Sequence, residues 1–483
     1  MQKSLSKNYF YSLVYQVLTL ITPFITTPYV SRVLGVEGVG VSSYVTSVVF
    51  YFTLIAALGT ATIGQREVAY KRDSVTERSI AFWNAEFLNI LMVFLACIIY
   101  YAFCMFQAEN VLYYKILMLN IITVAVDIVW FFQGLEEFKK IVIRNIIFKI
   151  IGIAYIFIFV QTANDVDIYI LGASLTAFLS ALSLWGYLPN YIKWVSWKKL
   201  HIKETFYQSL LLFIPTLAVS FYVVLDKLMI GWFTLDYVEN GNYEQAMKIS
   251  KMSLSVIFSL VAVMTPRISY CFQKRDFNTV HNYMYKSYRF LWLISLPICF
   301  GLWSISYHFV PWFFGPDFIK VAPILCLLAL LVPIQGIAII SGGQFLVPIK
   351  EERHYTYSVI LGALTNLMLN LFLIPRYFAM GAALASVMGE IVVVSVQLYY
   401  VRRSLSLANI LKSSRNYLLA STIMFIILYF VGLNFQANIL ATIVQVVLGV
   451  FVYSIILIIL HDALAFTCIK RAGSTIRKLI NNK

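Results

Sequence analysis

The sequence predicts an all-α polytopic membrane protein with about fourteen spans, and three observations lead to this prediction. Of its 483 residues, 61% are hydrophobic and 12% are charged, with a mean hydropathy of +0.81. Soluble domains carry about 25% charged residues, so a soluble fold of this length could not bury so much apolar surface. Apolar runs of about 20 residues, the length that crosses a bilayer core, recur along the chain. These runs are too long for the strands of a β-barrel, and they lack the alternation of polar and apolar residues that such strands show.

The apolar runs define the spans in chain order. Short loops join them, so we expect no separate soluble domain. The predicted spans are 9–32, 39–63, 82–105, 112–133, 147–163, 167–189, 208–233, 247–266, 290–314, 321–348, 356–375, 378–401, 416–434 and 437–461.

The basic residues predict the orientation, because cytoplasmic loops collect Lys and Arg. With a cytoplasmic N-terminus, the cytoplasmic segments hold 29 of the 37 Lys and Arg residues. The predicted outer loops hold only Lys320 and Arg376. We therefore place both termini in the cytoplasm. The excess of basic residues in the cytoplasmic loops accounts for the net charge of +15. The sequence offers no soluble basic face, so we expect no nucleic-acid partner.

Cysteine and histidine patterns give no sign of a cofactor. The six cysteines lie in spans or on the cytoplasmic side, so we expect free thiols. The five histidines form no HxxH pattern, so we expect no metal site. A coupling ion, H⁺ or Na⁺, remains possible.

A weak internal repeat predicts the domain organisation. LGASLTAFLSA (171–181) aligns without gaps with MGAALASVMGE (380–390), and the first and seventh spans both contain proline. Repeated six-helix bundles are a transporter architecture. We predict an N-terminal six-helix lobe at 1–189, a cytoplasmic linker at 190–207, a second lobe at 208–403, and a two-helix extension with a cytoplasmic tail at 404–483. Chance similarity between apolar helices is the alternative interpretation.

Cations within spans are the candidate substrate-binding residues, since a charge in the bilayer costs free energy and usually has a task. If the two halves pack about a cleft, five cations could line a path for an anionic headgroup such as a phosphate. Snorkelling of these side chains to lipid headgroups is the alternative. The five are Arg32, Lys149, Lys227, Lys248 and Lys251.

Three acids within spans are candidate ion-coupling residues. Asp127 in the fourth span and Glu390 in the twelfth are expected to be buried without an adjacent partner, and Asp226 precedes Lys227. They could bind a proton or a cation, or could neutralise the cations. A hydrogen-bonded acid between helices is the structural alternative.

Three stretches resemble the Wzx-type polysaccharide repeat-unit flippases. They are ITTPYVSRVLGVEGVGVSSYV (25–45), DIVWFFQGLEEFKKIVIRNIIFKI (127–150) and NLMLNLFLIPRYFAMGAALASVMGE (366–390). These flippases belong to the superfamily of multidrug, oligosaccharidyl-lipid and polysaccharide exporters, and the resemblance covers nearly the whole chain. RYFAMG departs from the family, which more usually has a glycine soon after LIP.

The resemblance implies a fold and a function. The fold would be two six-helix lobes in a V-shaped, MATE-like arrangement around a cationic cavity, with Arg32 and Lys227 at cavity positions. The substrate would be an oligosaccharide linked through diphosphate to undecaprenol, flipped to the outer leaflet of the bacterial plasma membrane by alternating access. Polymerase and glycosyltransferases would be the protein partners.

Three other functions stay open at this point. A multidrug extruder would have acids dominating its cavity, whereas cations outnumber acids within these spans. A membrane polymerase would need a large outer loop with catalytic groups, and the sequence has none, so we predict a transporter without catalytic residues. A lipid II flippase fits the same pattern.

Overall fold

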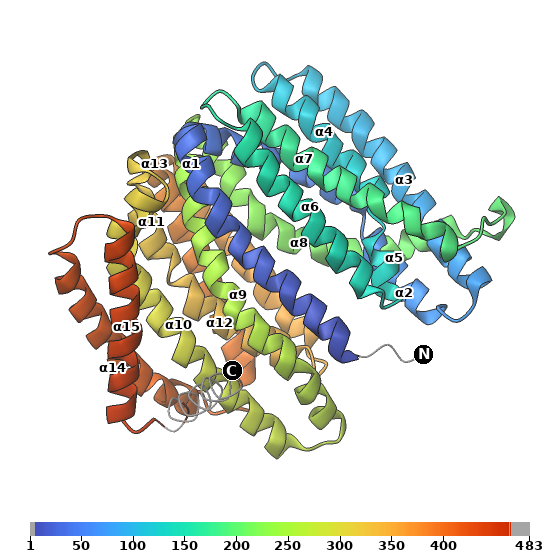
Figure 1. The fold of residues 1–483 in the computed structure, drawn as a ribbon. Helices are drawn as coiled ribbons and strands as arrows, with labels where there is room; N and C mark the ends of the chain where they lie inside the picture. The colour runs from blue at the N-terminus through green and yellow to red at the C-terminus, as the bar shows by residue number, and fades with distance from the viewer. Residues whose placement is uncertain (1–4, 463, 465–483) are drawn as a thin grey trace, which may run out of the picture. The chain divides into compact units, whose positions relative to one another are not determined.

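The computed structural model describes residues 5–462 and 464, and it describes their side chains except at 5–17, 20, 214–216, 218–219, 221–223, 259–260 and 262–263. Every regular element in these residues is a helix (Figure 1), which confirms the predicted all-α class. The chain divides into two compact units. Unit 1 comprises 1–231 and 236–241, and unit 2 comprises 232–235 and 242–483. Most of the predicted C-terminal tail, 463 and 465–483, lies outside the described residues.

Ten helical segments of the described residues are long and apolar enough to cross a membrane. Two of them, Ile21–Tyr70 and Glu352–Val401, are 50 residues long and contain a non-helical residue. Gly35 (φ 68°) divides the first and Phe378 (φ 54°) the second. The helix before Gly35 begins at Leu5, so every part is long enough to cross by itself. With helices of 33 and 37 residues at 202–234 and 237–273, these segments match the fourteen predicted spans.

Unit 1 contains the helices that precede the middle of the chain. Its long helices run antiparallel through short loops. They are α1 (Leu5–Ala57), α2 (Thr60–Tyr70), α3 (Val75–Met105), α4 (Val111–Val126), α5 (Val129–Gly134), α6 (Phe138–Phe159), α7 (Val166–Ser183), η1 (Leu184–Asn190), η2 (Trp197–Lys199) and α8 (Ile202–Thr234).

Aromatic packing holds the core of unit 1 together. Phe82 of α3 stacks on Trp130 of α5 with ring centroids 5.5 Å apart, and the ring of Phe131 contacts the ring of Phe82 edge-on. Gly64 of α2 lies under Trp130, where a Cβ atom would come within 2.5 Å of the indole. The helices pack closely at this position because α2 has no side chain there.

Unit 2 contains the remaining helices. The predicted span at 321–348 is divided into two short α-helices and a π-helix. The elements are α9 (Tyr237–Gln273), whose first residues belong to unit 1, α10 (Phe277–Phe313), η3 (Pro316–Phe318), α11 (Val321–Leu328), α12 (Leu331–Ala338), η4 (Ile339–Leu346), α13 (Glu352–Val401), α14 (Leu407–Gly432) and α15 (Ile439–Ile459).

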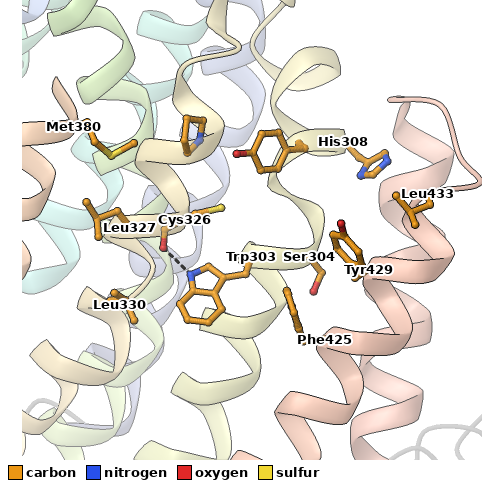
Figure 2. A pocket seen from close by; sticks show the side chains of 12 residues that line it. Trp303, Ser304, His308, Cys326, Leu327, Leu330, Met380, Phe425, Tyr429 and Leu433 are labelled. Carbon is orange, nitrogen blue, oxygen red and sulfur yellow. Dashed lines mark hydrogen bonds between the residues drawn. The ribbon is translucent and has the colours of Figure 1, made fainter. Parts of the chain in front are cut away.

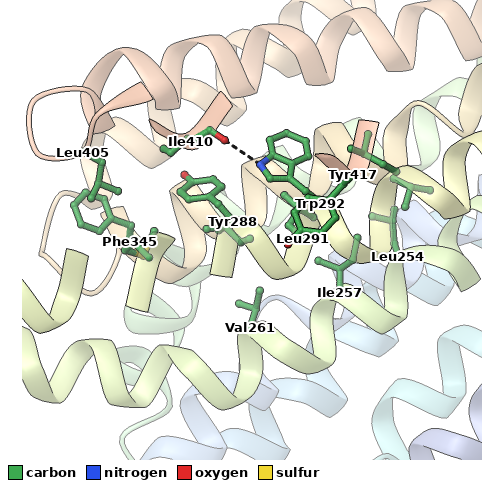
Figure 3. Packing of buried hydrophobic residues seen from close by; sticks show 14 of the residues in the cluster. Leu254, Ile257, Val261, Tyr288, Leu291, Trp292, Phe345, Leu405, Ile410 and Tyr417 are labelled. Carbon is green, nitrogen blue, oxygen red and sulfur yellow. Dashed lines mark hydrogen bonds between the residues drawn. The ribbon is translucent and has the colours of Figure 1, made fainter. Parts of the chain in front are cut away.

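The core of unit 2 lies between α9, α10 and α14 (Figure 3). Leu254 and Ile257 of α9 contribute aliphatic side chains, and Tyr288 and Trp292 of α10 contribute rings. The indole of Trp292 donates to the carbonyl of Ile410 at the start of α14, with N and O 3.2 Å apart. Helix α14 is thereby packed onto α10, although the internal repeat predicted from the sequence leaves α14 outside the second lobe at 208–403.

The two compact units do not share the boundaries of the predicted lobes. Helix α8 begins within the predicted linker at 190–207, yet it belongs to unit 1 as far as Gly231. The pair of lobes related by an internal repeat stays a prediction.

Candidate functional site

Arg32 and Lys227 flank one junction of helices in unit 1. Arg32 is exposed on α1, three residues before the break at Gly35, and Lys227 is half-buried on α8, one turn before Gly231. With its side-chain amide turned over, Asn240 donates to the carbonyl of Lys227 at 2.8 Å and accepts from the amide of Gly231 at 3.2 Å. The junction therefore holds α8 against the first turn of α9.

Three glycines allow the helices to meet at this junction. A Cβ on Gly40 would lie 1.7 Å from the carbonyl oxygen of Tyr237, and one on Gly241 would lie 2.1 Å from that of Val36. A Cβ on Gly231 would lie 2.3 Å from the ring of Tyr44. The backbone of α1 after its break therefore touches the start of α9. Glycine at these positions brings the chain segments that carry Arg32 and Lys227 to the same part of unit 1.

Lys149 faces α1 from α6. Its ammonium donates to the hydroxyl of Thr19 at 3.1 Å. Two further cations on α6 take part in packing. Lys140 bonds the hydroxyl of Tyr191, and Arg144 donates to the carbonyl of Ser180 at 2.9 Å. Of Lys140, Arg144 and Lys149, only Lys149 stays a candidate for a cationic path along α6.

Lys248, Lys251 and Glu390 belong to unit 2. Lys248 is half-buried and Lys251 exposed, both on α9. Glu390 on α13 is 6% exposed, as predicted, and Tyr355 lies close enough to interact with it electrostatically. The substrate-binding and ion-coupling roles of these residues stay predictions.

The expectation that Asp127 is buried without a partner is wrong. Asp127 is exposed, and it lies where the fourth predicted span breaks between α4 and α5. Its carboxylate accepts the amide of Val129 at 3.1 Å. An aspartate that bonds the backbone two residues on offers an alternative to the helical bond, so the chain turns here. Asp226 is 4% exposed, and Tyr51 lies within electrostatic reach of it.

An open apolar pocket of about 750 Å³ lies in unit 2 (Figure 2), and sequence reasoning missed it. Aromatic side chains line it from two helices, with Trp303 and Tyr307 on α10 and Phe425 and Tyr429 on α14. The indole of Trp303 is fixed because it donates to the carbonyl of Cys326 at 2.6 Å. The other lining residues are Ser304, His308, Pro323, Cys326, Leu327, Leu330, Met380 and Leu433. A pocket of this size and lining fits a hydrocarbon chain.

Sequence reasoning also missed Glu86. It is a fully buried acid on α3, inside the predicted span 82–105. An ionisable group within a span is the signal that could have found it.

The many helices that are long and apolar enough to cross a membrane define a multi-pass membrane protein. Residues 5–272 match the family model described as "Polysaccharide biosynthesis protein", and the chain belongs to that family. It is 23% identical over 409 residues to the "Putative O-antigen transporter" of Escherichia coli (strain K12), covering 83% of this chain and 97% of the relative. It is also 23% identical over 265 residues to the "Probable low-salt glycan biosynthesis flippase" of Haloferax volcanii, covering 54% and 55%.

The fold is similar to solved transporter structures. The structure described as "Lipid II flippase MurJ, inward closed conformation" superposes with a TM-score of 0.73 at 17% identity, covering 95% of this chain and 99% of that one. This likeness concerns the fold. The family match and these relatives confirm the predicted resemblance to the Wzx-type flippases, and the relatives themselves are named as a transporter and a flippase.

Proposed function

We propose that this protein flips an oligosaccharide linked through diphosphate to undecaprenol from the inner to the outer leaflet of the bacterial plasma membrane. The flipped repeat unit would feed the synthesis of a surface polysaccharide. The apolar pocket between α10, α11 and α14 carries the proposal, because it offers the hydrocarbon part of a lipid-linked substrate an apolar surface within the helix bundle. The names of the relatives support a glycan as the polar part of the substrate.

Each part of such a substrate needs a different surface. A prenyl chain gains about 0.8 kcal/mol for each CH₂ group that it buries against apolar side chains. The diphosphate needs cations, and Arg32 and Lys227 are the candidates because they flank one helix junction. Alternating access would expose the headgroup first to one side of the membrane and then to the other.

The membrane potential could drive the export step. One charge that crosses the membrane exchanges about 2.3 kcal/mol per 100 mV. A headgroup with two negative charges would gain roughly 4–5 kcal/mol per 100 mV when it leaves a negative interior. A potassium diffusion potential across proteoliposomes tests this directly: inside-negative vesicles should flip faster from the inner leaflet than vesicles without a potential.

Flipping by purified protein in liposomes tests the cation site. Replacing Arg32 or Lys227 by Ala should slow flipping of a prenyl-diphosphate glycan at least about tenfold, as loss of one charge-assisted contact predicts. Lys115→Ala is the control, since it removes an exposed cation from α4. Undiminished flipping in both site variants would remove these residues from the site.

The pocket has its own test. Leu327→Trp puts an indole into the pocket, and Leu364→Trp puts one on an exposed position of α13. We expect the first variant alone to raise KM for a long prenyl chain and to leave a short-chain analogue unaffected. An equal rise in KM for the long-chain and the short-chain substrate in Leu327→Trp would contradict a prenyl site.

The same assay separates the competing substrates. Faster flipping of lipid II than of any repeat unit would favour a lipid II flippase, and export of cationic drugs would favour a multidrug extruder. Cytoplasmic termini, as the positive loops predict, can be tested by protease digestion of oriented membrane vesicles. Partnership with a polymerase or glycosyltransferases can be tested by co-purification.

A further inference from the structure

Glu86 is a carboxyl group buried in the core of unit 1. Its side chain is 0% exposed, and neither of its oxygens has a hydrogen-bond partner of good geometry among the described residues. Its polar neighbours on α3 differ in this respect. Asn84 accepts the amide of His201 at 2.7 Å, and Asn89 bonds two other helices.

The surroundings of Glu86 are held in place by those bonds. The amide of Asn89, one turn along α3, donates to the carbonyl of Val124 on α4 at 2.8 Å. Its oxygen lies 3.4 Å from the hydroxyl of Thr60 on α2, which can donate to it. The Asn89 side chain also lies close enough to interact with the carboxyl group of Glu86, although no hydrogen bond of good geometry forms between them. Helices α2, α3 and α4 are thus joined beside an acid that they leave unpaired.

Asp127 is the charged group that acts on Glu86 from the neighbouring elements. It carries the same sign and lies in the break between α4 and α5. The charged residues of α2, Arg66 and Glu67, lie about two turns along the helix from Thr60. Arg66 donates to the side chain of Gln208 at 3.1 Å. Glu67 pairs there with Lys71 at 3.1 Å.

The other helices that pack against α3 bring no cation to Glu86. Between residues 40 and 57, α1 contains no charged residue. The only charged residue within α4 is Lys115, close to its other end. Among the described residues, no positive charge therefore compensates an ionised Glu86.

A buried carboxylate without a hydrogen bond or a counter-charge costs several kcal/mol, and such a group becomes neutral instead. A nearby like charge increases that cost. We propose that Glu86 is a proton-binding site of unit 1, which holds a proton on one carboxyl oxygen at neutral pH. It releases the proton only when the helix packing around it changes and admits water or a cation. This role does not depend on which glycan the protein carries.

A small polar cavity offers a route for the proton. Asn84 and Ala85, which directly precede Glu86, line a cavity of about 100 Å³ between α2, α3 and the start of α8. Its titratable lining side chains are those of Glu67, Lys71, His201 and Glu204, and Lys71 pairs with Glu67. These groups can exchange protons with water at the end of the bundle where the loops are basic.

Infrared difference spectroscopy of the full-length protein in lipid nanodiscs tests the proposal without a transport assay. The wild-type protein should show the band of a protonated buried carboxyl at neutral pH, and Glu86→Gln should lack it. Asp127→Asn is the matched control, because it removes an exposed acid and should keep the band. Circular dichroism confirms that each variant is folded.

Two results would overturn the proposal. Identical carboxyl bands in the wild type and in Glu86→Gln, from acid to neutral pH, would show that Glu86 is ionised. Loss of the band on addition of Na⁺ at constant neutral pH would show a cation site in place of a proton site. A failure to flip glycans would leave the expected band unchanged, so the two proposals fail separately.

Discussion

Arg289 donates to Asp462 across 2.8 Å, and the carboxylate of Asp462 is 2% exposed. The hydroxyl of Tyr417 completes the cluster, since it accepts from Arg289 at 3.0 Å and donates to Asp462 at 3.0 Å. The three side chains come from α10, α14 and the residues after α15. One cluster therefore joins the C-terminal helix pair to the rest of unit 2.

Loss of the Asp462 carboxylate should destabilise unit 2. Asp462→Asn removes the negative acceptor of three hydrogen bonds, from Arg289, Tyr417 and the amide of Leu464, so we expect the free energy of unfolding to fall by about 1–3 kcal/mol. Thermal denaturation in detergent, followed by tryptophan fluorescence, measures the change. Asp73→Asn replaces an exposed aspartate and serves as the control. Equal melting temperatures for the two variants would show that the cluster contributes no stability.

Gly40 should not tolerate a side chain. A Cβ at this position would lie 1.7 Å from the carbonyl oxygen of Tyr237, and a backbone atom cannot move aside as a side chain can. We expect Gly40→Ala to lower the free energy of unfolding by about 1–3 kcal/mol. Gly186→Ala is the matched control, since it meets nothing within 4 Å. The prediction fails if Gly40→Ala melts at the same temperature as the control.

Phe378 has a backbone conformation that favours glycine. Its φ of 54° and ψ of −134° lie in a region that L-residues rarely adopt, at the turn between the two parts of α13. Because Phe378→Gly and Phe378→Ala both remove the ring, they differ mainly in this strain. We expect the glycine variant to be more stable than the alanine variant by about 1 kcal/mol. A more stable alanine variant would contradict the strain.

Asp165 should make stability depend on pH. Its carboxylate accepts the amides of Gln161 at 2.8 Å and Thr162 at 2.7 Å, and these bonds lower its pKa below the ordinary value of 3.8. A lowered pKa in the folded state means that the contribution is present above the ordinary value and is lost as the pH falls through the folded value. The wild type should therefore melt higher than Asp165→Asn at neutral pH.

The difference between these two proteins should shrink when the pH falls below about 3.8. Melting temperatures over a pH series measure it, with Asp73→Asn again as the control. A difference that stays constant into acid would show that the charge of Asp165 has no part in the effect.

The spans were predictable because hydropathy and segment length are local properties. The break at Gly35 separates the first two predicted spans, and the turn at Phe378 separates the eleventh from the twelfth. The departure from glycine at RYFAMG also appears as a strained residue. By contrast, the π-helix at 339–346 has no local signal that distinguishes it from an α-helix.

The sequence by itself determined the membrane class, the number of spans and the family, because the length of apolar runs and the order of motifs can be read directly from the linear sequence. Only the tertiary structure decided which acids are buried. Asp127, inside an apolar run, is exposed at a helix break, whereas Glu86 is enclosed by α2, α3 and α4. It also decided that α10, α11 and α14 leave an apolar pocket. Burial depends on which helix faces meet, and that depends on contacts between residues far apart in the chain.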